Sequence, residues 1–171
     1  MHKNSPLTKE DVAEAVFYFY HVIIPILAEP GKTVNTGVVL NIRDHSDTWI
    51  LNARGGNATE RQFQKLEMTA HEQNNALHRH REASSTWMLR NHRPNPPQPG
   101  AIRTPYDDRL AIVGFTWQQN QSASLWLAER LRRMSFQETH RVAYQSVDGR
   151  DYIRHRSLFR SLANKLEDKV T

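Results

Sequence analysis

Residues 109–134 constrain the fold of this chain most strongly, because a buried strand runs there directly into an amphipathic helix. Residues 110–115 form an uninterrupted apolar run of strand length, which predicts a central strand covered on both faces. We expect a polar turn over residues 118–122, and then a helix over 124–134 whose apolar residues recur every three or four positions. The opposite face of that helix would carry the charged residues Glu129, Arg130, Arg132 and Arg133.

The N-terminal part of the chain predicts another helix. Thr8 fits an N-cap and Asp11 occupies the position of a capping-box acid, so this helix should begin near Lys9. Its apolar surface is wide enough for contact on more than one side, which favours either a deep core position or a subunit interface. Pro25 should kink or end the helix, because proline removes a backbone donor.

The middle of the chain predicts a hairpin and a long polar helix. Residues 37–43 and 48–53 are rich in β-branched and apolar side chains and flank a polar turn. A helix should follow over about 60–81, capped by Asn57 or Thr59, and residues 84–89 should add a separate helical turn.

The remaining segments complete a single domain over residues 1–171. Five prolines between residues 91 and 105 predict a loop, since proline favours extended geometry in the residue before it. Residues 141–147 alternate in the manner of a strand, residues 148–149 indicate a turn, and a basic amphipathic helix is expected at about 157–170. We therefore predict an α/β (α+β) fold, in which helices pack against a small, mainly antiparallel sheet.

Composition narrows the functional classes. The chain has no cysteine, which excludes disulfides, thiolate metal sites and a cysteine nucleophile. No apolar stretch reaches the roughly 20 residues of a membrane span and no secretory signal is evident, so we expect a cytoplasmic protein without membrane partners. The net charge is +5, and the basic residues dominate after residue 60. This charge permits binding to nucleic acid, to an anionic cofactor or to an acidic protein.

Histidines offer the clearest candidates for ligand chemistry. His71 and Glu72 begin a near match to the HExxH zinc motif, but Asn75 replaces the second histidine, so a zinc protease is excluded. His71 and His78 share one helix face and could bind haem iron or zinc, or could be solvated surface residues. No phosphate-binding glycine motif or nucleophile elbow is present, and we assign no catalytic residue.

Arginines interleaved with aromatic residues favour a second kind of site. The expected C-terminal helix and the residues before it carry Tyr152 and Phe159 among the arginines, a pattern that suits phosphates and stacked bases. The same aromatics could instead form the core face of an ordinary amphipathic helix. The candidate nucleic-acid-binding residues are Arg150, Arg154, Arg156 and Arg160.

Short stretches over residues 7–134 resemble the GlcG-like family, whose members are also called haem-degrading or haem-binding domains. Leu7, Thr8 and Asp11 are similar to the opening of that family, and residues 38–44 (VVLNIRD) resemble its strand that ends in VVD. Arg54 with Gly55 and Gly56, Lys65 with Thr69 and Ala70, and residues 111–115 (AIVGF) are similar to three further family segments.

The resemblance implies a helix-flanked antiparallel sheet, an oligomer, and a pocket for haem or a related ligand. Asp44, Arg54 and Lys65 would then line or support the pocket, and His71 or His78 would supply an imidazole. Our leading hypothesis is a small-molecule-binding protein of this kind. The alternatives are a basic nucleic-acid-associated protein and a homo-oligomeric interaction protein built on the aromatic first helix.

Overall fold

The computed structural model describes residues 6–28, 37–92, 94–146 and 149–169. Within them lies a four-stranded antiparallel sheet with the order β2-β1-β4-β3. The strands are β1 (Val38–Arg43), β2 (Trp49–Gly55), β3 (Ile102–Arg103) and β4 (Arg109–Val113). The predicted hairpin and central strand are confirmed, and the expected α+β class is the one observed.

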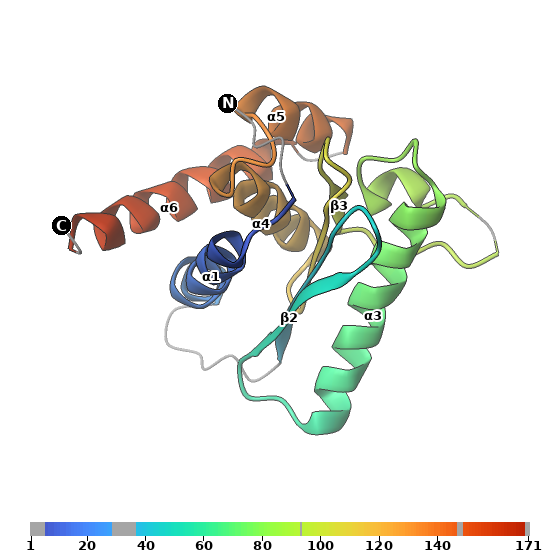
Figure 1. The fold of residues 1–171 in the computed structure, drawn as a ribbon, viewed down its shortest axis with the longest axis horizontal. Coiled ribbons are helices and arrows are strands. Elements are labelled where there is room, and N and C mark those ends of the chain that lie inside the picture. Colours follow the sequence, from blue (N-terminus) through green and yellow to red (C-terminus); the bar gives the residue numbers. More distant parts are fainter. Residues whose placement is uncertain (1–5, 29–36, 93, 147–148, 170–171) are drawn as a thin grey trace.

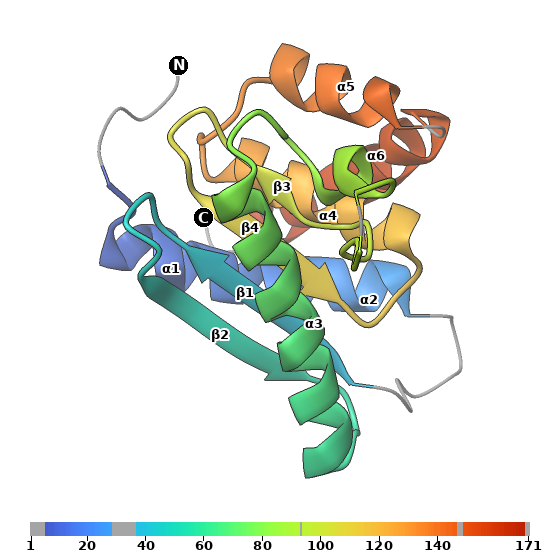
Figure 2. The ribbon, with the colours of Figure 1, turned by 90° about the vertical axis from the view of Figure 1, so that its right-hand side faces the viewer.

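Helices cover both faces of this sheet (Figures 1 and 2). One face packs against α3 (Glu60–Arg79), while α1 (Lys9–Tyr18) and α4 (Trp117–Arg130) cover the other. In β1, Val38, Leu40 and Ile42 belong to the larger core with α1 and α4, while Val39 joins the smaller core beneath α3. This two-sided burial explains why β1 and β4 are buried along their whole length.

The first helix begins as predicted and continues past Pro25. Thr8 and Asp11 form a reciprocal capping box at its start. After α1 the chain forms a π-helical segment, η1 (Phe19–Ile23), and then α2 (Ile24–Leu27), so Pro25 does not end the helix. The wider π turn directly precedes the proline, whose missing donor is tolerated at the start of α2. Tyr18 and Phe19 are buried, whereas Phe17 and Tyr20 are partly exposed.

Three predictions of secondary structure are wrong. Residues 118–122 are not a turn, because Thr116 and Gln119 form a capping box that starts α4 at Trp117. Residues 141–145, expected in a strand, belong to α5 (Phe136–Gln145), which Ser135 caps. The last helix, α6 (Gly149–Asp168), starts eight residues earlier than the expected position 157. Residues 147, 148 and 170 lie outside the described ranges.

The long helix and the helical turn predicted for the middle of the chain are confirmed, and the predicted loop over residues 91–105 is confirmed only in part. Thr59 caps α3, and the separate helical turn is the 3-10 helix η2 (Thr86–Leu89). The proline-rich segment ends in the short edge strand β3, so residues 91–105 are not loop throughout. Within the described ranges, no helix combines the length and the apolarity needed to cross a membrane.

Candidate functional site

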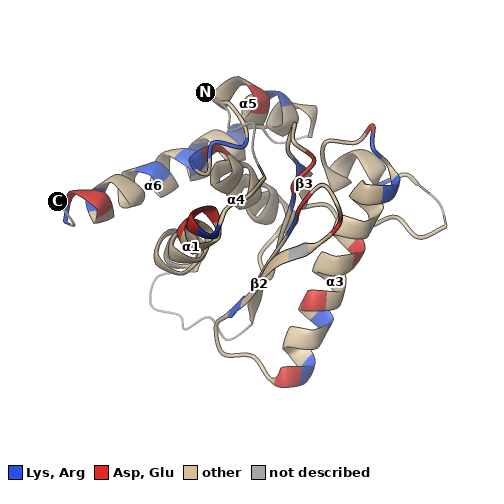
Figure 3. Cartoon of the chain, viewed as in Figure 1, with Lys and Arg blue, Asp and Glu red and all other residues tan. Residues whose placement is uncertain are grey.

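A cleft of about 600 Å³ lies between α1, the C-terminal end of α4, and α6. Figure 3 shows basic segments spaced along α6, which forms one wall of this cleft. Most of the side chains around it are charged. The lining residues are Glu14, Tyr18, Trp126, Glu129, Arg130, Leu131, Arg132, Arg156, Arg160 and Glu167.

Arg156 on α6 forms a bidentate ion pair with Glu129 on α4. Its Nε donates to Glu129 Oε2 at 2.9 Å, and its Nη2 donates to Oε1 at 2.7 Å. This hydrogen bonding raises the pKa of Arg156. Tyr152, one turn earlier on α6, donates its hydroxyl proton to Thr139 at 2.8 Å, and burial raises its pKa far above the ordinary value. These contacts join α4, α5 and α6 at one side of the cleft.

A second ion pair closes the opposite side of the cleft. Arg130 on α4 pairs with Glu167 on α6, and its Nε donates to the Tyr18 hydroxyl at 3.1 Å. Tyr18 in turn donates to Glu167 at 2.8 Å, so α1, α4 and α6 meet at one triad. Hydrogen bonds from Arg130 and then Tyr18 lower the pKa of Glu167, while burial is the main cause that raises the pKa of Tyr18.

The two ion pairs leave an excess of positive charge in the cleft. Arg132 and Arg160 form no ion pair with any described residue. Glu14 is the remaining acidic residue of the lining and is exposed on α1. Two guanidinium groups are therefore available to a ligand, with one carboxylate opposing them. An anion of small size suits this arrangement.

Arg132 adopts a backbone conformation that seldom accommodates an arginine. Its φ is +61°, in the left-handed region, immediately after the end of α4. The amide of Arg132 donates to the Glu129 carbonyl at 2.9 Å, and that of Arg133 donates to the Ala128 carbonyl at 2.8 Å. This pair of bonds is a Schellman motif, in which glycine is the usual left-handed residue. The turn directs Arg132 to the cleft and Arg133 into the core.

Three of the predicted ligand residues, Asp44, Arg54 and Lys65, lie outside this cleft. Asp44 is in the β1–β2 turn, where it accepts from the amides of Ser46 at 3.0 Å and Thr48 at 2.9 Å. Burial raises the pKa of Asp44, but these bonds and the one from the Ser46 hydroxyl lower it by more than burial raises it. The pKa of Asp44 is therefore below its ordinary value. Arg54 pairs with Glu60 at 2.7 Å and with Glu67 at 2.5 Å. Lys65 is exposed on α3.

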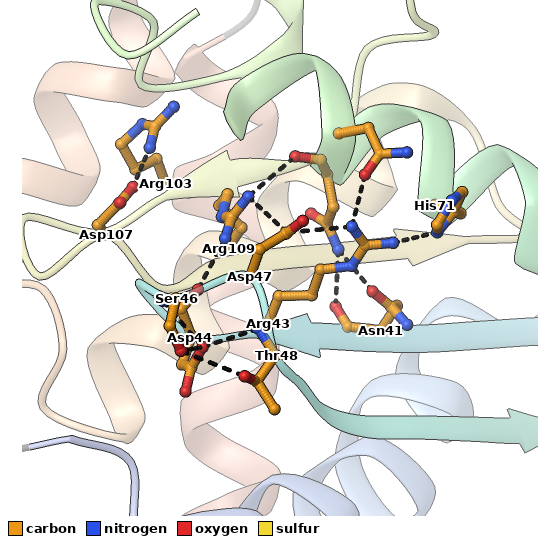
Figure 4. A network of polar contacts seen from close by, with 12 residues as sticks. Asn41, Arg43, Asp44, Ser46, Asp47, Thr48, His71, Arg103, Asp107 and Arg109 are labelled. Atoms are coloured by element: carbon orange, nitrogen blue, oxygen red, sulfur yellow. Dashed lines mark hydrogen bonds and ion pairs between the residues drawn. The ribbon is translucent and has the colours of Figure 1, made fainter. Parts of the chain in front are cut away.

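His71 and His78 are half-buried on the face of α3 that covers the sheet (Figure 4 shows His71). His71 Nδ1 contacts the guanidinium of Arg43, and burial followed by the charge of Arg43 lowers the pKa of His71. His78 lies close enough to Asp47 to lower the pKa of that carboxyl. The structure thus brings the two histidines to the contact between α3 and the β1–β2 turn, whereas Arg54 is held by Glu60 and Glu67 nearer the start of α3. None of the five predicted ligand residues lines the cleft.

A row of three arginines lies beneath α3, and no sequence pattern indicated it (Figure 4). Arg43, Arg109 and Arg103 are cross-strand neighbours on β1, β4 and β3. Asp47 lies 3.1 Å from Arg43 Nη1 and 2.9 Å from Arg109 Nη1, and Asp107 pairs with Arg103. The guanidinium group of Arg109 also donates to the Asn74 carbonyl in the C-terminal half of α3, and that of Arg103 donates to the carbonyl of the C-cap His80. This row therefore holds α3 to the sheet.

The turns that carry these aspartates have the same geometry. The side chain of Asp44 in the first turn, and that of Thr104 in the second, accepts hydrogen bonds from the backbone amides two and four residues later. Asp47 and Asp107 occupy equivalent left-handed positions, with φ values of +63° and +65°. Each aspartate pairs with the arginine four residues before it. The short pattern Arg-x-x-x-Asp thus builds two equivalent strand-to-strand turns.

The four predicted nucleic-acid-binding arginines separate into two groups. Arg156 and Arg160 line the cleft. Arg150 and Arg154 are exposed on α6 away from it, and Arg154 pairs with Asp151 at 3.2 Å. Sequence reasoning missed the contribution of Arg132, because the usual signal for a left-handed helix end is glycine. It also placed Arg133 on an exposed face, whereas that side chain is buried.

A second cavity, of about 400 Å³, lies between the turn after α3, the β3 region and α5. Its charged lining consists of Arg81, Glu82, Arg103, Glu138 and Arg141. Arg103 is already paired with Asp107. Arg81 and Arg141 also form no ion pair with any described residue, so unpaired charge does not distinguish the two sites. The first cleft is the stronger candidate because it is larger and is lined by Arg132 in its left-handed conformation.

Comparisons with known proteins give no homologue from which to transfer a function. No family model matches the chain, and neither curated proteins nor solved structures provide a significant match.

Proposed function

We propose that this protein binds a small anionic molecule, carrying a carboxylate or phosphate group, in the cleft between α1, α4 and α6. The volume of about 600 Å³ is within the range of small-molecule sites. Arg132 and Arg160 supply the positive charge, and Tyr18 and Trp126 supply aromatic surface. The proposal assigns binding and no catalytic step.

The conformation of Arg132 is the observation that carries this proposal. A side chain other than glycine in the left-handed region costs roughly 1 kcal/mol, and such strain is characteristic of functional sites. Glycine would satisfy the Schellman motif without this cost. An arginine at this position instead places a guanidinium group in the cleft.

Other ligands proposed from the sequence suit this cleft less well. Haem offers a large apolar ring, whereas the cleft is lined mainly by charged groups and by no histidine. The haem ligand, the relation to the GlcG-like family and a homo-oligomer stay predictions. Nucleic-acid binding along α6 also stays a prediction, and the pairing of Arg154 with Asp151 and of Arg156 with Glu129 weighs against it.

Replacing Arg160 by glutamine is expected to weaken anion binding at least tenfold. The substitution removes one charged hydrogen-bond donor, and such a contact contributes about 1.5–3 kcal/mol. Titration calorimetry with pyrophosphate and with citrate measures the effect. Intrinsic tryptophan fluorescence provides a second signal, because Trp126, one of the four tryptophans of the chain, lines the cleft.

Arg154→Gln is the matched control, because it removes the same charge from the same helix outside the cleft. It should leave the affinity unchanged. Equal weakening by Arg154→Gln and Arg160→Gln would mean that only the net charge matters. Wild-type protein that shows no saturable binding of either probe would overturn the proposal.

Arg132→Gly is expected to increase stability and decrease binding together. The free energy of unfolding should rise by about 0.5–1 kcal/mol as the backbone strain is relieved. Anion affinity should fall at least tenfold, because a guanidinium group leaves the cleft. Arg132→Lys keeps both the charge and the strain, so it should resemble the wild type in both measurements. Urea unfolding and calorimetry on the two variants test this, and undiminished binding by Arg132→Gly would contradict the assignment.

A further inference from the structure

A separate cluster of potential metal ligands lies where α3 ends. His80, Glu82 and His92 each present a ligand atom, and these atoms lie within 4.8 Å of one another. The His80 Nδ1 atom is 3.7 Å from a Glu82 carboxylate oxygen, and the two imidazole rings have centroids 4.7 Å apart. None of the three residues lines the cleft assigned to the anion.

The backbone around these residues is fixed by hydrogen bonds. His80 is the C-cap of α3, where its amide donates to the Ala76 carbonyl at 3.0 Å. The His80 carbonyl accepts from the Ala83 amide at 3.1 Å and from Arg103 Nη2 at 3.3 Å. The His92 amide donates to the carbonyl of Leu89, a buried residue, at 3.0 Å. The ligand positions are therefore largely arranged before a metal binds.

The three ligand atoms need only a small movement to reach the spacing that a zinc site requires. Zinc binds nitrogen and oxygen ligands at about 2.0–2.2 Å in tetrahedral geometry, so its ligand atoms lie roughly 3.4 Å from one another. Glu82 and His92 are exposed and can move by the small distance that remains. The nearby Arg90 guanidinium is stacked 3.4 Å above the Trp87 ring, which keeps its charge on that ring.

The chemistry of the three ligands identifies the class of metal. Imidazole nitrogen favours zinc, nickel and copper, whereas calcium and magnesium require mostly oxygen ligands. Two histidines and one carboxylate leave a fourth position for water. We propose that His80, Glu82 and His92 form a binding site for a divalent transition metal of the zinc type, which joins the end of α3 to the segment after η2.

The full chain is first treated with a chelator, which is then removed. Zinc chloride is then titrated into the protein, and calorimetry measures the binding. One zinc ion should bind per chain, with at least tenfold selectivity over magnesium and calcium. The double variant His80→Ala/His92→Ala should weaken this binding at least tenfold. Glu82→Gln should weaken it less, because both imidazoles remain.

The matched control is His45→Ala, which removes an exposed histidine from the β1–β2 turn and should leave zinc affinity unchanged. Circular dichroism checks that each variant is folded. The proposal is overturned if the double variant binds zinc as tightly as the wild type. It is also overturned if wild-type protein binds no zinc, or if magnesium and calcium compete on equal terms.

Discussion

Asp108→Asn should lower the free energy of unfolding by about 3–5 kcal/mol, the expected cost of breaking a buried ion pair by removing one partner. Asp108 Oδ2 accepts from Arg133 Nε at 2.6 Å, and both side chains are only 2% exposed. The substitution keeps the size of the side chain but leaves the guanidinium of Arg133 buried without this counter-charge. Urea denaturation at pH 7, followed by circular dichroism, measures the loss.

A double substitution tests whether charge is the cause. Asp108→Leu with Arg133→Met replaces both partners by apolar groups, so no lone charge remains buried, and we expect much of the lost stability to return. Asp151→Asn is the exposed comparison, because its partner Arg154 is 68% exposed, and it should change stability by less than about 1 kcal/mol. A loss of that small size for Asp108→Asn would refute the importance of the buried pair.

Asp47→Asn should cost about 3 kcal/mol of stability at neutral pH. Asp47 is an ion-pair partner of both Arg43 and Arg109, whose side chains are 1% and 0% exposed. The aspartate itself is 33% exposed, so water reduces the penalty to the lower part of the range for buried pairs. Asparagine tolerates the left-handed backbone of this position, so the substitution changes charge without adding strain.

The effect of Asp47→Asn should depend on pH in a defined direction. Burial raises the pKa of Asp47, but Arg43 and Arg109 lower it by more than burial raises it. The folded-state pKa is therefore below the unfolded value. The stability that Asp47 contributes is therefore present above about pH 4 and is lost as the pH falls through the folded pKa. Wild type and Asp47→Asn should differ fully at pH 7 and much less at pH 2–3, as measured by urea unfolding.

Asp107→Asn is the internal comparison for Asp47. It occupies the equivalent left-handed position, but among the described residues it pairs only with Arg103, which is 11% exposed. Losing one charged contact should cost about 1.5–3 kcal/mol or less. Asp107→Asn should therefore be the milder of the two variants. An equal loss for both would mean that the turn conformation, rather than the shared pairing of Asp47, determines the stability.

The ion pairs of Arg43 and Arg109 with Asp47 also explain the surroundings of His71 and His78, which the sequence offered as ligand residues. His71 packs against Arg43, and His78 lies near Asp47, so both are parts of the contact between α3 and the sheet. Periodicity alone placed them together on one helix face. Whether that face met solvent, a ligand or a row of arginines depended on which strands lay beneath it.

Local signals were sufficient for the starts of α1 and α3, whereas the equally local capping boxes of α4 and α5 were missed. Thr8 with Asp11, and Thr59 with Gln62, satisfy free amides within one helical turn, so the helix starts could be predicted from neighbouring residues. The apolar run of β4 likewise predicted a strand covered on both faces. Residues 141–145 failed this approach because their alternation is also compatible with one face of a helix, and packing against α4 and α6 selected the helix.

The sequence by itself determined the class of fold, the sheet's central strand, the starts of α1 and α3, and the basic charge of the C-terminal part. Only the tertiary structure decided which charges were neutralised, because that depends on pairs distant in the chain. Glu129 faces Arg156, Asp108 faces Arg133, and Arg130 meets Glu167. Arg132 and Arg160 were left in one cleft without an acidic partner among the described residues. This property follows from where the helices cross, and residue order does not reveal it.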